Sequence, residues 1–511
     1  MDGIRRRPAP SKRAANGRRP AGQLPNGHAA GLTGALRAGE SPDREATRYL
    51  SAATQIDIKY AENVVDRVVN ERLRALAPTF GVDVPVVAKW AIKAVRTRAV
   101  RDNLLTAILM LQLLLTVIVI LWWDWAWTFI ALLLIAAWLA VSWDYRERMH
   151  QIVRGKMLRD RFDPAEAPSP YRQPDVERLH EIAKRRDGNL AVFSGHSAFI
   201  GSGAPVYGQR LLLDIMGGKE PDTGTARKPD PFTSYDLHLA IIDAFGRERG
   251  LAKSLDNVRV YERLFVNGLH VQNNEQLLPN RLQAPPTSVD NRLLQAAAVR
   301  PSPEARTYVC VEMPGWQGQL VVTLFIRAVY AGDSLYVEYV FRALRPIRRE
   351  FLLIDSLYDY SRFGQLKDSL RHGLWELIPA LLASPGQVLG SRRRRGKTRR
   401  EQSWSIHAIE RGYVFDYGAS RSIREYASGG QRQHYFLARD ETMYLLLAQQ
   451  TLIQAVRKFL SDHGIDLSQF DAQVKIIFDK SIHIGDIKDS TGVAVGDSAS
   501  ATVGGSPKGA E

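Results

Sequence analysis

The feature that most constrains this chain is a run of forty almost uninterrupted apolar residues, 104–143, in which Asp124 carries the only charge. About 20 apolar residues, at roughly 1.5 Å rise each, cross a hydrocarbon core of roughly 30 Å, so forty residues predict two spans. An ionised Asp at the centre of one helix would cost about 3 kcal/mol, whereas a turn places its carboxylate in water. We therefore predict a transmembrane helical hairpin with spans 104–123 and 125–143. The membrane turn consists of Trp123, Asp124 and Trp125.

The composition of the two spans argues against two other structures. Water-soluble helices need a polar face and neither span has one, which argues against a hairpin buried in a soluble protein. The clear polar groups in the spans are Gln112, Thr106 and Thr116, and no charged side chain lines a path, so an ion-conducting pore is not supported. Gln112 is able to hydrogen-bond across helices for about 0.6 kcal/mol, which fits packing of the hairpin or a homo-oligomer formed through it.

Cations flank the hairpin on both sides, and the turn carries none. Because positive residues favour the cytoplasmic side, we expect a multi-pass protein of the plasma membrane with both termini in the cytoplasm. The hairpin lies too far from residue 1 for a cleaved signal peptide and is therefore an internal anchor. The flanking cations are Lys89, Lys93, Arg96, Arg98 and Arg101 before the first span, and Arg146, Arg148, Arg154, Lys156, Arg159 and Arg161 after the second.

The net charge of +15 is concentrated in two short segments, residues 1–20 with net +6 and residues 391–400 with net +7. Neither segment interleaves aromatic residues that would stack on bases, which argues against nucleic acid as a partner. On a protein held at the inner leaflet, an arginine run attracts anionic lipid by about 1 kcal/mol per residue. We therefore take Arg392, Arg393, Arg394 and Arg395 as candidate lipid contacts, with a solvated loop as the alternative.

The chain divides by composition and periodicity, and we expect an α+β cytoplasmic domain in addition to the transmembrane hairpin. The predicted divisions are a disordered basic arm (1–44), a small helical cytoplasmic domain (45–102), the hairpin (103–144), a charged stalk (145–187), the α+β domain (188–390), a basic linker (391–402), a strand-helix-strand segment (403–487) and a flexible tail (488–511).

Within the α+β domain, strand-like runs come first in pairs and helical runs are segregated, which favours α+β over a doubly wound sheet. Gly332 and Asp333 are typical of a hairpin turn between two of the runs. The predicted strands are 189–195, 209–215, 258–268, 307–314, 319–331 and 334–344, and the predicted helices are 234–249 and 351–383. Farther on, 404–418 is strand-like, 441–464 is helical and 474–487 is the last apolar run.

Catalytic signatures are thin, and we assign no catalytic residue, no cofactor and no metal ligand. Gly195-His196-Ser197 begins like a nucleophile elbow but lacks the second glycine that the sharp turn needs. Gly201 and Gly203 form half of a dinucleotide fingerprint, and an ordinary loop or a turn close to a ligand both fit. The single cysteine, Cys310, lies in an apolar alternating run and reads as a buried strand residue in a reducing compartment.

Two further sets of polar residues have structural interpretations. The histidines form none of the short-spaced pairs typical of zinc sites, and His238 and His407 fit the pattern of structural histidines. Asp416, followed by Arg421 and Arg424, fits either a polar pocket for an acidic group or a strand end followed by a helix cap. The second interpretation is the simpler one.

Several blocks of the sequence resemble a family of uncharacterised actinobacterial two-span integral membrane proteins. The blocks follow the same order over nearly the whole chain: 47–71, 80–87, the hairpin, 188–203, 415–425, 459–470 and 482–499. The resemblance implies a membrane location and this architecture, and it implies no catalytic residues. The segment GDIKDSTGVAVG (485–496) also resembles short strand-turn segments appended to proteins of bacterial conflict and signalling systems.

These observations favour an integral membrane protein that anchors a ligand- or partner-binding α+β domain at the inner leaflet. The alternative is a membrane-perturbing effector of a bacterial conflict or signalling system, in which the hairpin oligomerises and acts on the bilayer. A membrane-bound enzyme comes third. The absence of charged residues from both spans favours the anchoring role over the effector.

The cation distribution predicts a topology. A reporter fused to either terminus should be exposed to the cytoplasm, and Asp124→Cys should react with an impermeant thiol reagent from outside the cell. Labelling of this cysteine only after lysis, together with external termini, would show that the orientation is inverted.

Overall fold

The computed structural model describes residues 42–122, 127–184, 188–215, 229–246, 255, 258–357, 361–429 and 435–487. The chain divides into two compact units, Met1–Glu40 and Ser41–Glu511, and every described residue belongs to the second. Most of the predicted basic arm (1–44), the predicted tail (488–511) and the membrane turn at Trp123, Asp124 and Trp125 lie outside the described residues.

The N-terminal helical part consists of α2 (Pro42–Ile56), α3 (Ile58–Val64) and the π-helical turn η1 (Val65–Asn70). Apolar residues recur at helical spacing up to Leu76, which predicts one helix over 46–77. The structure breaks it at Asp57, whose side chain accepts hydrogen bonds from the backbone N–H groups of Lys59 and Tyr60. An Asp at this position caps a new helix more favourably than it continues an old one.

Two long helices follow, α4 (Val84–Trp122) and α5 (Trp127–Tyr145), and both are long and apolar enough to cross a membrane. In the most apolar window of each helix, only 28% and 22% of the residues are buried. A core helix of a soluble protein is mostly buried, whereas most of this apolar surface is left uncovered by the described part of the chain. The chain continues from α5 into the π-helical stretch η3 (Arg146–Val153) and α6 (Arg154–Lys156).

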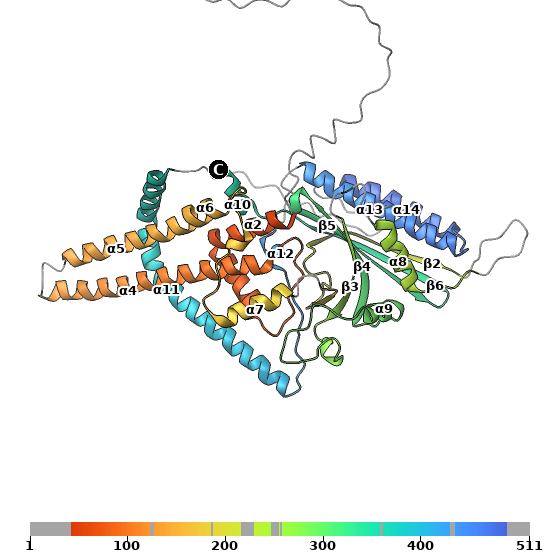
Figure 1. Ribbon diagram of the computed structural model, residues 1–511, viewed down its shortest axis with the longest axis horizontal. Coiled ribbons are helices and arrows are strands. Elements are labelled where there is room, and N and C mark those ends of the chain that lie inside the picture. The colour runs from red at the N-terminus through yellow and green to blue at the C-terminus, as the bar shows by residue number, and fades with distance from the viewer. Residues whose placement is uncertain are drawn as a thin grey trace, which may run out of the picture. The chain divides into compact units, whose positions relative to one another are not determined.

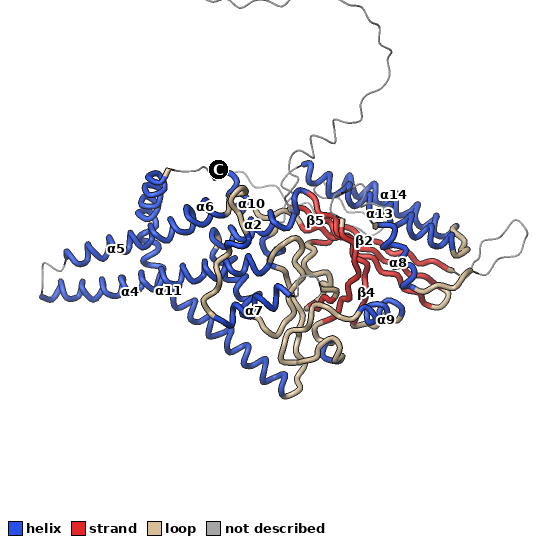
Figure 2. The backbone as a smooth tube through the Cα atoms, viewed as in Figure 1, coloured by secondary structure: helices blue, strands red, loops and turns tan. Residues whose placement is uncertain are grey.

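A six-stranded sheet forms the other main element (Figures 1 and 2). Its strand order is β1-β3-β4-β5-β6-β2. All pairs are antiparallel except β1 with β3. The β5–β6 turn falls at Gly332-Asp333 as predicted, with Gly332 at φ 62°. All six predicted strands are present: β1 (Leu190–Phe193), β2 (Ala204–Asp214), β3 (Arg259–Asn267), β4 (Ala305–Gly315), β5 (Leu320–Ala331) and β6 (Ser334–Leu344).

The two faces of the sheet are covered differently. Figure 1 shows α8 (Ser234–Phe245) and α13 (Tyr435–Asp462) on one face, where strand residues such as Val311 and Leu324 join one large apolar cluster. On the other face Phe199 stacks on Phe325, with the ring centroids 4.2 Å apart. Cys310 is buried in the same aromatic cluster. Because successive side chains of β4 point to opposite faces of the sheet, this strand contributes residues to the clusters on both faces.

The region after the sheet differs from the prediction. Instead of a helix over 351–383, a basic linker over 391–402 and a strand over 404–418, one helix, α11, runs from Arg362 to Glu410. Arginine, lysine and glutamine have high helix propensity, so the basic run continues the helix. The run predicted as a strand over 474–487 is likewise helical, in α14 (Ser468–Ile487). Its Gln473 bonds both backbone groups of Leu212 and so covers the edge of β2.

Shorter helical segments complete the described part of the chain. They are η4 (Pro164–Glu166), α7 (Gln173–Lys184), η6 (Val271–Asn273), α9 (Asn291–Val299), η7 (Trp316–Gly318), α10 (Arg349–Leu352), η8 (Leu353–Ser356) and α12 (Ile423–Ala427). The predicted stalk (145–187) is therefore helical in part.

A close backbone approach joins the loop after β1 to the segment between η1 and α4. Gly201 adopts φ 88°, and a Cβ placed on it would lie 2.0 Å from the carbonyl oxygen of Pro78. Gly203 adopts φ 85°, and its Cβ would lie 2.2 Å from the carbonyl oxygen of Ala343. The half-fingerprint of glycines thus serves packing of protein backbone against protein backbone.

The approach at Gly201 predicts a difference between two substitutions in one loop. Gly195 has a similar φ of 76° and nothing within 4 Å of its Cβ position, so Gly195→Ala should lose about 1 kcal/mol of stability through backbone strain alone. Gly201→Ala should lose a further 1–3 kcal/mol, roughly, because the Pro78 carbonyl must move. Thermal unfolding of the purified chain in detergent measures both losses. Equal losses would show that the segment at Pro78 gives way freely.

Candidate functional site

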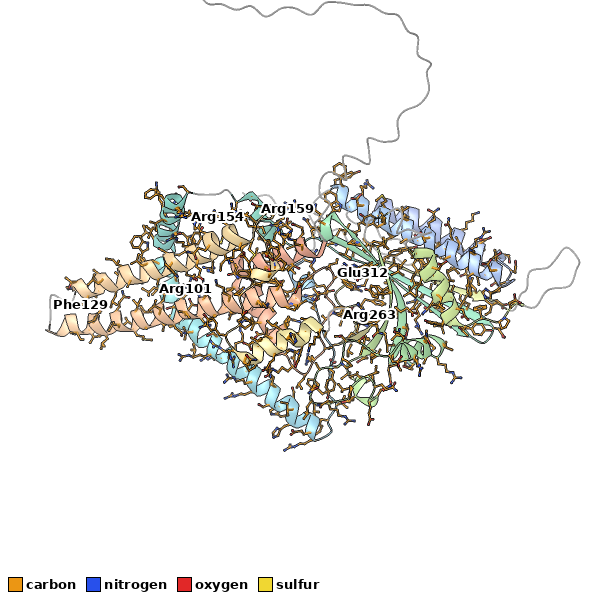
Figure 3. All side chains as sticks on the ribbon, viewed as in Figure 1. Arg101, Phe129, Arg154, Arg159, Arg263 and Glu312 are labelled. Atoms are coloured by element: carbon orange, nitrogen blue, oxygen red, sulfur yellow. The ribbon has the colours of Figure 1, made fainter. Side chains whose placement is uncertain are left out.

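Three buried ionic groups join α4 to α5 at the end of the hairpin nearest to α11, which we call the foot of the hairpin. Arg101 donates to Asp102 at 2.7 Å and to Asp144, across the hairpin, at 3.2 Å. The side chains of Arg101, Asp102 and Asp144 are 7%, 7% and 3% exposed. A buried charge is tolerated only when it is paired and hydrogen-bonded, so this bridge fixes how the two helices meet. Figure 3 labels Arg101 near the crossing of the hairpin with α11, far from Phe129 toward the tip.

Two more arginines complete this network. Arg148 donates to Asp144 at 2.7 Å, and Arg98 lies 3.6 Å from Asp102 and 4.0 Å from Asp144. The Nε of Arg98 has no hydrogen-bond partner among the described residues. Three guanidinium groups therefore share two carboxylates, and the foot of the hairpin keeps a positive excess.

Small residues let α11 pack closely against the hairpin. A Cβ on Gly373 would lie 2.0 Å from Ser142 Oγ, and Ser369, Ala380 and Ser384 are buried on the same side of α11. Close approach through small side chains is typical of helix packing in membranes. Trp138 Nε1 also donates to the carbonyl oxygen of Leu370 at 2.9 Å. Helix α11 is thereby fixed across the hairpin.

The C-terminal half of α11 reaches the N-terminal helical part. Arg394 forms an ion pair with Glu62 of α3, and the side chain of Gln402 donates to the carbonyl oxygen of Asn70. These contacts join residues more than 300 positions apart in the sequence.

A cavity of about 1850 Å³ lies between the foot of the hairpin, α3 with η1, the segment 168–175 and α11. Arg98, Arg101 and Asp144 of the ion-pair network line it, and Arg96 on α4 covers the exposed ring of Tyr171 at 3.6 Å. Eleven cationic side chains face six carboxylates in the lining, so the cavity favours an anionic group. The cations are Lys59, Arg72, Lys89, Lys93, Arg96, Arg98, Arg101, Arg172, Arg394, Arg395 and Arg399.

The structure separates the four candidate lipid contacts. Arg394 and Arg395 line this basic cavity, and Arg392 and Arg395 line a smaller neighbouring one of about 440 Å³. Arg393 lines neither of these two cavities, and all four side chains are exposed. The arginine run lies on a helix, so its members point in different directions around the axis.

The structure supports the structural interpretation of the Asp416 segment. Asp416 accepts hydrogen bonds from Ser194 and from the backbone N–H of Gly418, and Ala419 forms a parallel bridge with Phe193. Arg424 is fully buried and donates to the carbonyl oxygens of Gly318 and Gln319 at 2.7 and 3.1 Å, while Arg421 is exposed. Burial lowers the pKa of Arg424 to about 10. The two arginines therefore form no joint pocket.

The remaining candidates also have structural surroundings. His238 is buried, accepts from the backbone N–H of Ala328 through Nε2 at 3.3 Å, and lies 3.2 Å from Glu262 through Nδ1. Ser197 is exposed, and within the described residues no histidine hydrogen-bonds to it. His407 lies exposed near the end of α11. No group of His, Cys, Asp and Glu able to hold a metal occurs in the described part of the chain.

Sequence reasoning counted Lys89, Lys93 and Arg96 only as topology signals and did not single out Lys59, Arg72 or Arg172. The sequence does contain a signal that the first three act together: their spacing of four and three residues places them on one face of a helix before the span. No local pattern indicates the other three, since they come from separate segments that only the tertiary fold brings together.

One comparison with known proteins gave a match. A family model described as an AbeC-like domain matches residues 209–490, more than half of the chain. The matched segment includes most of β2, strands β3–β6 and all of α11 and α13. No curated protein and no solved structure matches.

The ion-pair network predicts a large effect of removing one carboxylate. Asp144→Asn should lower stability by about 3 kcal/mol, because the half-buried Arg148 would lose its carboxylate and the buried Arg101 would lose one of its two. The matched change Glu166→Gln, in a half-exposed pair with Lys156, should cost less than about 1 kcal/mol. Thermal unfolding in detergent compares the two variants. Similar small shifts would mean that the foot of the hairpin is held by apolar packing alone.

Proposed function

This chain belongs to the family of proteins with an AbeC-like domain, and we propose that it is a membrane-anchored binding protein. In this proposal α4 and α5 cross the plasma membrane, both termini lie in the cytoplasm, and the sheet domain is held at the inner leaflet. The basic cavity at the foot of the hairpin binds the phosphate-bearing headgroup of an anionic lipid.

The membrane anchor is supported by the uncovered apolar surface of the hairpin. Leu113, Leu132 and Trp143 are each more than half exposed, on helices whose windows are less than one third buried. Such a surface in water would be an aggregation liability, whereas lipid chains cover it without loss. The cations at the foot agree with a cytoplasmic side by the positive-inside rule.

The observation that carries the choice of ligand is that the cavity has both a basic and an apolar side. Leu104 and Trp143, the first and last residues of the apolar run, line the cavity together with Arg98 and Arg101. A lipid places its phosphate beside its acyl chains in the same way. The cavity is larger than the roughly 300–1,000 Å³ typical of small-molecule sites, so a headgroup enters together with water.

Guanidinium groups suit this ligand because their planar donors bind phosphate oxygens in pairs. Arg395 and Arg399 reach both the large and the small cavity. Arg394, in contrast, is held by Glu62. Arg395 and Arg399 are therefore the side chains on α11 most available to a headgroup.

Titration of the full-length chain in detergent with short-chain phosphatidylglycerol tests the proposal. Arg395→Gln should weaken binding about fivefold, following an attraction of about 1 kcal/mol per cation. Arg400→Gln makes the same charge change on the same helix outside both cavities and should change the affinity by less than about twofold. Binding should fall as salt rises from 0.1 to 1 M, since the screening length drops from about 10 to 3 Å.

Two further titrations separate the sources of the anion. Short-chain phosphatidylcholine carries no net charge and should bind weakly, and inorganic phosphate lacks the apolar part and should also bind weakly. If inorganic phosphate bound as tightly as the lipid, the ligand of the cavity would be a soluble anion and not a lipid. Equal losses of lipid affinity in Arg395→Gln and Arg400→Gln would show that the lipid is attracted by diffuse positive charge and not by contacts in the cavity.

A further inference from the structure

Helix α11 carries an exposed apolar stripe that no described part of the chain covers. Leu374, Trp375, Ile378 and Leu382 are 63%, 77%, 66% and 67% exposed, and Leu389 is 48% exposed. At 3.6 residues per turn these five positions fall on one face of the helix, within roughly a quarter to a third of its circumference.

The stripe lies on a different side of α11 from the two contacts already described. The side that packs on the hairpin carries Gly373, Leu377, Ala380 and Ser384. The side that lines the basic cavity carries Gln387 and Arg394, together with Gly390, Ser391 and Thr398. By helical spacing, the cavity side and the stripe point in roughly opposite directions. The helix is therefore amphipathic, with one face toward the cavity and the other uncovered.

The position at which α11 crosses the hairpin determines how deep this stripe lies relative to the apolar run. Figure 1 shows α11 crossing α4 and α5 rather than running alongside them. Its apolar contacts are with Leu105, Ile108, Ala137 and Val141. These residues belong to the first two and last two turns of the apolar run, so the crossing lies only about 5–10 Å inside it at 1.5 Å per residue.

We infer that the segment 374–389 of α11 lies in the plane of the inner leaflet, with its apolar stripe buried among the acyl chains next to the headgroups. This inference rests on the proposed function, because it requires the hairpin to span the bilayer. A helix with a basic polar face and Trp and Leu on the other face is typical of such interfacial insertion, to a depth of roughly 5–10 Å.

Charge placement favours a bilayer over a protein partner. Lys367 and Arg371 before the stripe, and Arg392 and Arg393 after it, lie on the same side of the helix as the stripe by helical spacing. All four side chains are exposed. Long cationic side chains at both ends of an apolar face reach back to phosphate groups while the face enters the lipid. Arg393, which lines neither basic cavity, would in this way contact lipid phosphate groups.

The test uses the full-length chain in nanodiscs of anionic lipid, with an environment-sensitive fluorophore on single cysteines. Ile378→Cys and Leu382→Cys report on the stripe. Ala383→Cys reports on an exposed position outside the stripe, about 100° around α11 from Leu382. Leu134→Cys reports on the α5 span. The native Cys310 is buried, and burial raises its pKa, so the unsubstituted chain serves as the unlabelled control.

The labels at 378, 382 and 134 should have blue-shifted emission that brominated acyl chains quench, while the label at 383 should be quenched by aqueous iodide. Quenching by lipid at 134 with iodide quenching at 378 and 382 would overturn the in-plane helix and leave the anchor intact. Iodide quenching at 134 would overturn the proposed function itself. Blue-shifted labels at 378 and 382 that neither agent quenches would mean that a second copy of the chain covers the stripe.

Discussion

The buried charges at the foot of the hairpin are the constraint on which the other parts depend. Asp144 ends an apolar helix and accepts from Arg101 on α4 and Arg148 beyond α5, at 3.2 and 2.7 Å. Because desolvated ions need partners, the two helices are able to meet in only one register. The same residues form one side of the basic cavity. The interaction that closes the hairpin therefore also creates the positive potential beside it.

Helix α11 joins the hairpin, the N-terminal helical part and the cavity because its faces differ. Small residues such as Gly373 permit close packing on α5, Arg394 reaches Glu62 on α3, and the uncovered Leu and Trp side chains point away from both. The match to the AbeC-like domain includes α11 and most of the sheet but begins after the hairpin. The helix that crosses the hairpin thus belongs to the family's domain, while the apolar helices lie outside the matched segment.

The elements that were predicted correctly differ physically from those that were not. Elements defined by strong local periodicity or by turn chemistry are confirmed, as in the six strands and the turn at Gly332-Asp333. Elements with mixed signals are wrong, as in 474–487, which lies in α14, and 404–418, whose first seven residues end α11 and whose remainder forms no strand. Arginine-rich composition suggested a linker, although arginine has high helix propensity and the preceding helix simply continues through it.

The sequence by itself determined the apolar hairpin, the concentration of cations on both sides of it and the α+β class of the body, because each depends on composition or spacing along the chain. Only the tertiary structure decided that Arg394 and Arg395 face a cavity with Arg98 and Lys59, that Arg424 is buried against backbone carbonyls, and that α11 crosses the hairpin. These relations join residues up to several hundred positions apart. Burial and pairing of charges in three dimensions decide them, and no local pattern records which distant partner a cation will meet.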